Sequence, residues 1–240
     1  MSRPRIVQAG DSTLVVELEP RIDPVVNQRA IQIAERMRAA AIAGVRDIVP
    51  TYRSVAVFFD PLHTRYDELV TRLEHESARE AVELPASRAP MQVPVCYGGD
   101  FGPDLESIAR RADMSPEEVV AVHSGEVYRV FMLGFLPGFA YMGLVDPRIA
   151  APRLSTPRLH VSTGSVGIAG RQTGIYPADT PGGWQILGRT SVRPFDITRS
   201  PAFSFKAGDS VQFVPVTRDE HERLVRLKPD TTYEGSSLCP

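Results

Sequence analysis

Short apolar runs and amphipathic stretches alternate over the first hundred residues. Residues 14–18, 45–52, 55–59 and 91–97 are rich in apolar and β-branched side chains, which predicts strands. Residues 24–43 and 65–82 carry apolar side chains at every third or fourth position, the period of a helix with one buried face. Asp23 before Pro24 marks the start of the first helix, and Gly44 marks its end. The order strand–helix–strand–strand–helix–strand predicts a small ferredoxin-like α+β domain over residues 1–88.

The pattern changes after a proline-bounded segment at residues 84–90, which we interpret as a linker. Two short helices are predicted at residues 104–111 and 115–122, the second opened by a capping box of Ser115 and Glu118. Beyond residue 127, short apolar runs at residues 127–133, 165–169, 185–187 and 211–214 alternate with glycine and proline turns. This pattern predicts a mainly β second domain, a barrel or sandwich, over residues 89–217. Residues 218–240 show no periodicity, so we expect a poorly ordered tail.

Charge and composition exclude several classes of partner. The chain has 27 Lys and Arg against 29 Asp and Glu, a net charge of −2, which gives no electrostatic case for binding nucleic acid or a membrane surface. No apolar run approaches the roughly 20 residues that span a bilayer. The two cysteines, Cys96 and Cys239, cannot form a disulfide framework, so we expect a cytoplasmic protein. The histidines lack the spacing of zinc ligands, and we expect no metal.

Glycine is concentrated in one part of the second domain. Ten of the 18 glycines lie within residues 134–188, where an even spread would place about four. One interpretation is a barrel with many tight turns and bulges. The other is a site in which main-chain N–H groups cradle an anion or a polarised carbonyl. Composition alone favours the turns.

Several side chains around these glycines suit a small polar ligand. Gln172 and Tyr176 can donate to a carbonyl or carboxylate, Trp184 can wall an amide ring, and Arg158 or Arg171 can hold a carboxylate. His123, at a helix end, is a candidate acid or base, although a structural cap is the commoner role for such a residue. Taken singly, each of these residues is also explained as barrel core or turn. The catalytic candidates are therefore His123, Gln172 and Tyr176, and the candidate substrate-binding residues are Phe135, Pro137, Gly138, Phe139, Tyr141, Arg158, Gly164, Ser165, Gly170, Arg171, Gln172, Thr173, Gly174, Tyr176, Gly183 and Trp184.

Motifs in the same region carry a specific family resemblance. The segments YRVFMLGFLPGFAY at residues 128–141, GSVGIAG at 164–170, QTGIYP at 172–177, PGGW at 181–184 and GRT at 188–190 are the matching blocks. With them, residues 5–216 resemble the family named variously PxpB (the B subunit of 5-oxoprolinase), KipI-type sporulation-kinase inhibitor and allophanate hydrolase subunit 1. The resemblance implies a small N-terminal domain followed by a cyclophilin-like β-barrel.

The resemblance also implies an activity and its partners. It predicts a subunit, inactive alone, of an ATP-dependent 5-oxoprolinase that converts 5-oxo-L-proline to L-glutamate. The expected partners are a homologous barrel subunit of the PxpC/KipA type and a third subunit of the LamB/YcsF type. No cofactor is expected on this chain alone, and the assembled complex is expected to use ATP and Mg. One alternative is a KipI-like protein that inhibits a sensor histidine kinase through an aromatic contact surface at residues 135–141. A second is a carboxyltransferase-type component related to urea carboxylase.

Overall fold

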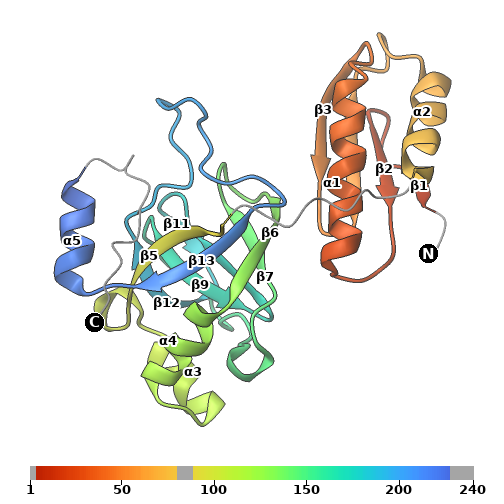
Figure 1. Cartoon of the computed structure of the whole chain (residues 1–240). Coiled ribbons are helices and arrows are strands. Elements are labelled where there is room, and N and C mark those ends of the chain that lie inside the picture. Colours follow the sequence, from red (N-terminus) through yellow and green to blue (C-terminus); the bar gives the residue numbers. More distant parts are fainter. Residues whose placement is uncertain (1–3, 80–88, 228–240) are drawn as a thin grey trace. The chain divides into compact units, whose positions relative to one another are not determined.

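The computed structural model describes residues 4–79 and 89–227. The chain divides into two compact units, residues 1–86 and 87–240 (Figure 1). Most of the segment interpreted as a linker, residues 84–90, lies outside the described residues. Each unit has its own apolar core, so each is described separately.

The first unit is a four-stranded antiparallel sheet with two helices. The strands are β1 (Arg5–Gln8), β2 (Thr13–Glu17), β3 (Val45–Pro50) and β4 (Ser54–Phe59), in the order β1-β2-β4-β3. The helices are α1 (Pro24–Ala39) and α2 (Tyr66–Ala78). The Asp23 side chain caps α1 by accepting from the backbone N–H groups of Val25 and Val26, as the sequence predicts. Ile33 and Leu69 from the helices join Val57 from the sheet in a core that is closed to solvent.

One strand assignment in this unit is wrong. The predicted final strand, residues 91–97, belongs to the barrel, and the edge position beside β2 is taken by β1. The sequence does not predict β1, because this strand is four residues long, follows Pro4 and has no buried residue. The strand at 91–97 is instead buried at four successive positions from Val93 to Cys96, which suits a barrel wall better than one face of an open sheet. The unit is therefore ββαββα rather than βαββαβ.

The second unit is built on a closed seven-stranded barrel, so the predicted α+β fold with a β-barrel is confirmed. Around the barrel the order is β10-β7-β6-β13-β5-β12-β9, and only the β13–β5 pair is parallel. The barrel strands are β5 (Met91–Tyr97), β6 (Val127–Leu133), β7 (Ala140–Gly143), β9 (Ser165–Ala169), β10 (Gln172–Ile175), β12 (Gln185–Thr190) and β13 (Ser210–Pro215). The remaining elements are β8 (Arg158–Val161) paired with β11 (Thr180–Gly182), α3 (Leu105–Ala112), α4 (Pro116–Gly125), α5 (Arg218–Arg226) and the 3₁₀ turns η1 (Gly99–Phe101) and η2 (Pro147–Ile149).

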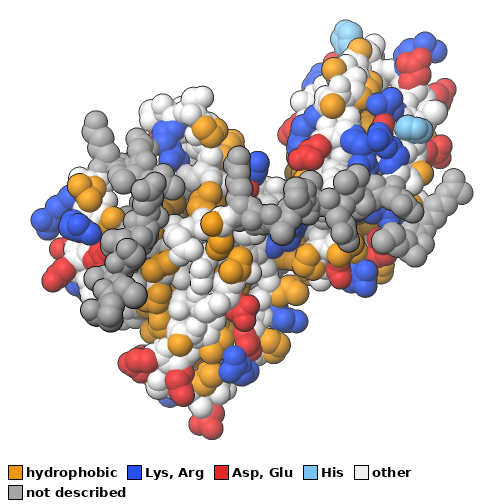
Figure 2. Space-filling view, viewed as in Figure 1, with side chains coloured by type: hydrophobic (Ala, Val, Ile, Leu, Met, Phe, Trp, Pro, Cys, Tyr) orange, Lys and Arg blue, Asp and Glu red, His pale blue; other side chains and the backbone are white. Residues whose placement is uncertain are grey.

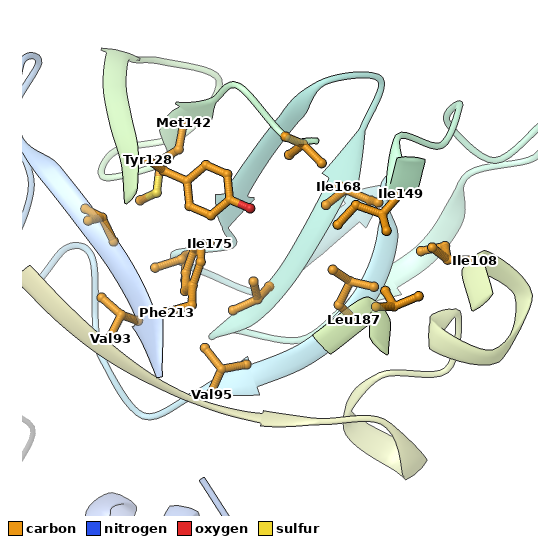
Figure 3. Packing of buried hydrophobic residues seen from close by; sticks show 14 of the residues in the cluster. Val93, Val95, Ile108, Tyr128, Met142, Ile149, Ile168, Ile175, Leu187 and Phe213 are labelled. Atoms are coloured by element: carbon orange, nitrogen blue, oxygen red, sulfur yellow. The ribbon is translucent and has the colours of Figure 1, made fainter. Parts of the chain in front are cut away.

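Side chains rather than open space fill the barrel. Figure 3 shows Tyr128, Met142, Ile168, Ile175 and Phe213 turned toward one another inside it. All five are almost completely inaccessible to solvent. Because these side chains occupy the interior, we look for binding sites at the ends of the barrel or outside its wall.

The region expected to be an unstructured tail begins with a helix. α5 starts after Thr217, whose hydroxyl accepts from the backbone N–H of Glu220, and it buries His221. Nine residues and one buried position are too few to give a clear helical period in the sequence. Residues 228–240 of the predicted tail lie outside the described part of the chain. Within the described residues, no helix is both long and apolar enough to cross a membrane.

Candidate functional site

Five of the predicted site residues form one aromatic cluster. Phe139 lies at its centre, with ring centroids 4.8 Å from Tyr141, 5.3 Å from Tyr176 and 5.3 Å from Trp184. Phe135 packs edge-on against Phe139 at 5.6 Å. The residues come from the 134–139 turn, β7, the end of β10 and the start of β12, so the fold brings together segments that are separated in sequence.

The cluster is mostly core. Phe139, Tyr176 and Trp184 are buried, whereas Phe135 is 61% exposed. The Tyr176 hydroxyl accepts a hydrogen bond from the backbone N–H of Trp184, and burial raises the pKa of Tyr176 above its ordinary value. Tyr176 is therefore a neutral, anchored phenol whose catalytic candidacy the geometry does not favour. Phe135 is the part of the cluster that a partner can reach. Its backbone is in the left-handed region, with φ 66°, and Pro137 and Gly138 follow it in the same turn.

The two arginines proposed to hold a carboxylate are engaged within the chain. Arg158 donates to Asp104 at 2.7 Å, and Asp104 also accepts from the backbone N–H of Ile186 at 2.6 Å. Arg171 donates through Nε to the carbonyl of Val145 at 3.0 Å. Arg158 thus links β8 to the segment before α3, so its geometry indicates a structural tie rather than a substrate clamp.

His123 lies in the barrel core and not at an exposed helix end. Its ring is fully buried and stacks on Phe213 with centroids 4.8 Å apart. Nδ1 is 2.7 Å from the Tyr97 hydroxyl, and Nε2 is 3.0 Å from the Thr173 hydroxyl. The Thr173 hydroxyl donates to the Gly167 carbonyl at 3.1 Å, so it accepts from Nε2–H, and Nδ1 accepts from Tyr97.

This hydrogen-bond chain assigns a role to His123. Burial lowers its pKa from 6.5 to about 3, so the ring is neutral at physiological pH. Both nitrogens are used and neither is accessible to solvent. The geometry therefore favours the structural role for His123, in which the ring joins α4 to β5 and β10, and its catalytic role stays a prediction.

The structure favours tight turns over a cradle of amides at the glycines that can be checked. Gly164 N–H donates to the Tyr176 carbonyl at 2.8 Å, and Gly170 N–H donates to the Ala151 carbonyl at 2.7 Å, so neither faces a ligand. A Cβ at Gly174 would lie 2.8 Å from the Ala140 carbonyl oxygen, which explains glycine there by close strand packing. The clustering of glycine in this sequence reflects a tightly wound barrel.

The remaining predicted residues scatter over the barrel. Ser165 and Thr173 are buried, and Gln172 is half-buried on β10, where it is paired in register with Gly143 and Ala169. A Cβ at Gly183 would make only ordinary contacts. Among the described residues, no three His, Cys, Asp or Glu side chains are grouped so as to hold a metal ion.

Gly164, one of the predicted residues, opens onto a large hollow. Arg189, Arg193 and His221 also line this hollow, and none of the three was predicted as a site residue. Arg189 stands in the GRT block at residues 188–190, but nothing in the sequence shows that α5 returns to this strand end. The hollow is thus a site that only the structure reveals.

Residues 4–205 match the family described as "Carboxyltransferase domain, subdomain C and D". The chain is 38% identical to the B subunit of 5-oxoprolinase from Bacillus subtilis over 229 residues, covering 91% of this chain and 95% of that protein. It is 39% identical to the B subunit of 5-oxoprolinase from Escherichia coli O157:H7, covering 90% of this chain and 97% of that protein.

Solved structures agree with the fold. TTHA0988 superposes with a TM-score of 0.75 at 35% identity over 85% of this chain, which corresponds to only 40% of that longer chain. The urea carboxylase of Kluyveromyces lactis superposes with a TM-score of 0.71 at 21% identity, over 93% of this chain and 22% of that chain. The latter likeness establishes the architecture alone.

Proposed function

The chain belongs to the carboxyltransferase-domain family of subdomains C and D, and from that membership we propose that it is the B subunit of a 5-oxoprolinase. The observation that carries the proposal is the 38–39% identity, over nearly the whole length of both chains, to proteins named as 5-oxoprolinase B subunits. In the proposed reaction, 5-oxo-L-proline, ATP and two water molecules give L-glutamate, ADP and phosphate. One water supplies oxygen to the ring carbonyl carbon as the ring C–N bond breaks, and the released nitrogen takes up a proton to become the amine of glutamate; the other water is consumed in converting ATP to ADP and phosphate.

We propose that this chain works only in an assembly. A protein named a subunit acts in a complex, and TTHA0988 carries a likeness to this chain together with a longer remainder in one polypeptide. The proposed partners are a homologous barrel subunit of the PxpC/KipA type and a third subunit of the LamB/YcsF type, with ATP and Mg used by the complex. Phe135, exposed and backed by the rigid ring of Phe139, is a suitable anchor for such a contact.

Reconstitution tests the proposal. The full chain, mixed with its two candidate partners, Mg and ATP, should release glutamate from 5-oxo-L-proline, and omission of ATP or of this chain should stop the release. A Phe135→Ala variant should weaken assembly, whereas an Arg111→Gln variant on the exposed face of α3 should not. A complex shown to be folded and assembled that yields no ATP-dependent glutamate would refute the proposal.

A carboxyltransferase-type role is the second candidate, because the matching family is described by that activity. It predicts carboxylation of urea by the assembled complex, with no glutamate release. The kinase-inhibitor alternative predicts capture of a sensor histidine kinase by the free chain and no ATP-dependent ring opening. ATP-dependent glutamate release in the reconstitution assay separates the first role from both alternatives, and carboxylation of urea or capture of a histidine kinase would then tell the alternatives apart.

A further inference from the structure

A hollow of about 430 Å³ lies on the second unit where the end of β12, the following loop and α5 meet. Among the described residues, its wall carries three arginines, Arg189, Arg193 and Arg226, against one carboxylate, Glu222. Glu222 is 3.6 Å from Arg226, so that charge is partly neutralised within α5. Figure 2 shows basic and acidic side chains side by side on α5. Arg189 and Arg193 leave the hollow with an excess of positive charge.

Arg189 has donor capacity that the protein does not use. Its Nε is buried and has no hydrogen-bond partner among the described residues. Its guanidinium carbon lies 5.1 Å from the centroid of the Phe101 ring, but within the described ranges no carboxylate lies at ion-pairing distance. A buried N–H without an acceptor is unfavourable, and the planar fork of arginine matches the two oxygens of a carboxylate or phosphate.

His221 presents a second unused group on the same wall. The residue is only 4% exposed, and its Nδ1 is buried without a partner in the part of the chain that the structure describes. Its ring centroid lies 4.9 Å from that of Phe101. Burial, and then the charge of Arg189, lower the pKa of His221, so the imidazole is neutral and can turn an N–H toward an anion.

Apolar groups complete the wall. The Phe101 ring, Val192 and Val225 line the hollow together with the polar residues. A cavity of this size, with apolar walls and a few convergent polar groups, is typical of small-molecule sites. Phe101 is held in place by Arg218, whose guanidinium carbon lies 4.8 Å from the ring centroid and which pairs with Asp100 at 3.1 Å. Arg218 is thus engaged elsewhere, and the anion-binding role falls to Arg189, Arg193 and His221.

We propose that this hollow binds a small molecule through its carboxylate or phosphate group, with Arg189 as the bidentate anchor. Arg193 adds charge at the rim, His221 donates from the buried wall, and Phe101 and Val192 contact the apolar part of the ligand. The inference goes beyond the proposed function and does not depend on it, because it rests on unpaired groups of this chain alone. Carboxylate and phosphate share the chemistry that the hollow recognises, so the test distinguishes these sources.

Isothermal titration of the full chain tests the site with four probes: 5-oxo-L-proline, L-glutamate, inorganic phosphate and ADP with Mg. At least one should bind with one-to-one stoichiometry. Arg189→Gln should weaken that binding about ten- to a hundredfold, as expected for loss of a charge-assisted bidentate contact. Arg189→Lys should restore it only in part, because lysine keeps the charge and loses the fork.

Two further variants keep the test independent of folding. Arg193→Gln, at an exposed position, should weaken binding several-fold without changing the melting temperature. Arg111→Gln, which removes an equal charge on α3, should bind as the wild type does. Binding of the carboxylates alone would assign a carboxylate site, and binding of phosphate or ADP would assign a phosphate site. The proposal is overturned if no probe binds, or if a probe binds equally to the wild type and to Arg189→Gln.

Discussion

Two buried histidines in the second unit are placed in opposite environments. His123, inside the barrel, has both ring nitrogens in hydrogen bonds and a ring stacked on Phe213. His221, on α5, is almost as buried, but its Nδ1 has no partner among the described residues and its pKa responds to the charge of Arg189. Burial lowers the pKa of both residues. Burial and a shifted pKa therefore do not separate a structural histidine from a binding one, whereas the use of its nitrogens does.

The difference extends to the arginines of the two regions. Arg158 is tied to Asp104 at 2.7 Å and supports the scaffold. Arg189 contacts an aromatic ring and has a buried Nε without an acceptor in the described part of the chain. A protein interior seldom leaves such groups unsatisfied unless something else meets them. We therefore assign stability to the region around His123 and ligand binding to the region around His221.

The largest expected effect comes from breaking the His123 chain. His123→Ala creates a cavity beside Phe213 and leaves the Tyr97 and Thr173 hydroxyls without their partner, so the free energy of unfolding should fall by about 3–5 kcal/mol. Urea denaturation followed by circular dichroism measures this loss. A loss below about 1 kcal/mol would show that the chain of hydrogen bonds does not stabilise the barrel.

His123 should also make stability depend on pH. The folded-state pKa is about 3 against an ordinary 6.5, so between these values the unfolded chain binds a proton that the folded chain does not. Stability should therefore be lost, by up to a few kcal/mol, as pH falls from about 6.5 toward 3. Urea titrations at several pH values should show a flatter profile for His123→Gln than for the wild type. Equal slopes would contradict a neutral, buried His123.

Breaking the ion pair between Arg158 and Asp104 should cost less stability than breaking the His123 hydrogen bonds. Arg158→Gln leaves Asp104, which is 7% exposed, without its cation, and should cost about 1–3 kcal/mol of stability. Thermal unfolding measures the loss, and Arg111→Gln serves as the control for removing a charge. A melting temperature equal to that of the control would mean that the pair contributes nothing.

His221 should show the smallest effect on stability. His221→Phe keeps an aromatic ring against Phe101 and removes the unpartnered nitrogen, so the free energy of unfolding should change by no more than about 1 kcal/mol. The affinity of the hollow for its carboxylate or phosphate ligand should nevertheless fall several-fold. Unfolding and titration of the same preparation check both values. A large loss of stability would place His221 with His123 as a structural residue.

Local signals predicted most of the architecture. Asp23 with Pro24 and Ser115 with Glu118 mark helix starts that the structure confirms, because capping depends on residues that are adjacent in sequence. The edge strand β1 and the helix α5 were missed because each is short and has at most one buried residue. The family resemblance predicted a β-barrel. The order of the strands around it could not be predicted, because hydrophobic periodicity does not show which strands are neighbours.

The site was harder to predict because its evidence is not local. The candidate binding residues Trp184, Tyr176 and Phe139 lie together in one cluster, yet their burial makes them core. The glycines indicated amides free for a ligand, and the amides of Gly164 and Gly170 proved to be bonded within the chain. Arg189 and His221 lie 32 residues apart in sequence, and only the return of α5 to the end of β12 brings them onto one wall.

The most direct test is a side-by-side titration of Arg189→Gln and Arg158→Gln with 5-oxo-L-proline and inorganic phosphate. The account predicts that Arg189→Gln loses affinity about ten- to a hundredfold while keeping wild-type stability within about 1 kcal/mol, and that Arg158→Gln loses stability but binds as the wild type does. Undiminished binding by Arg189→Gln, or loss of binding by a folded Arg158→Gln, would contradict it.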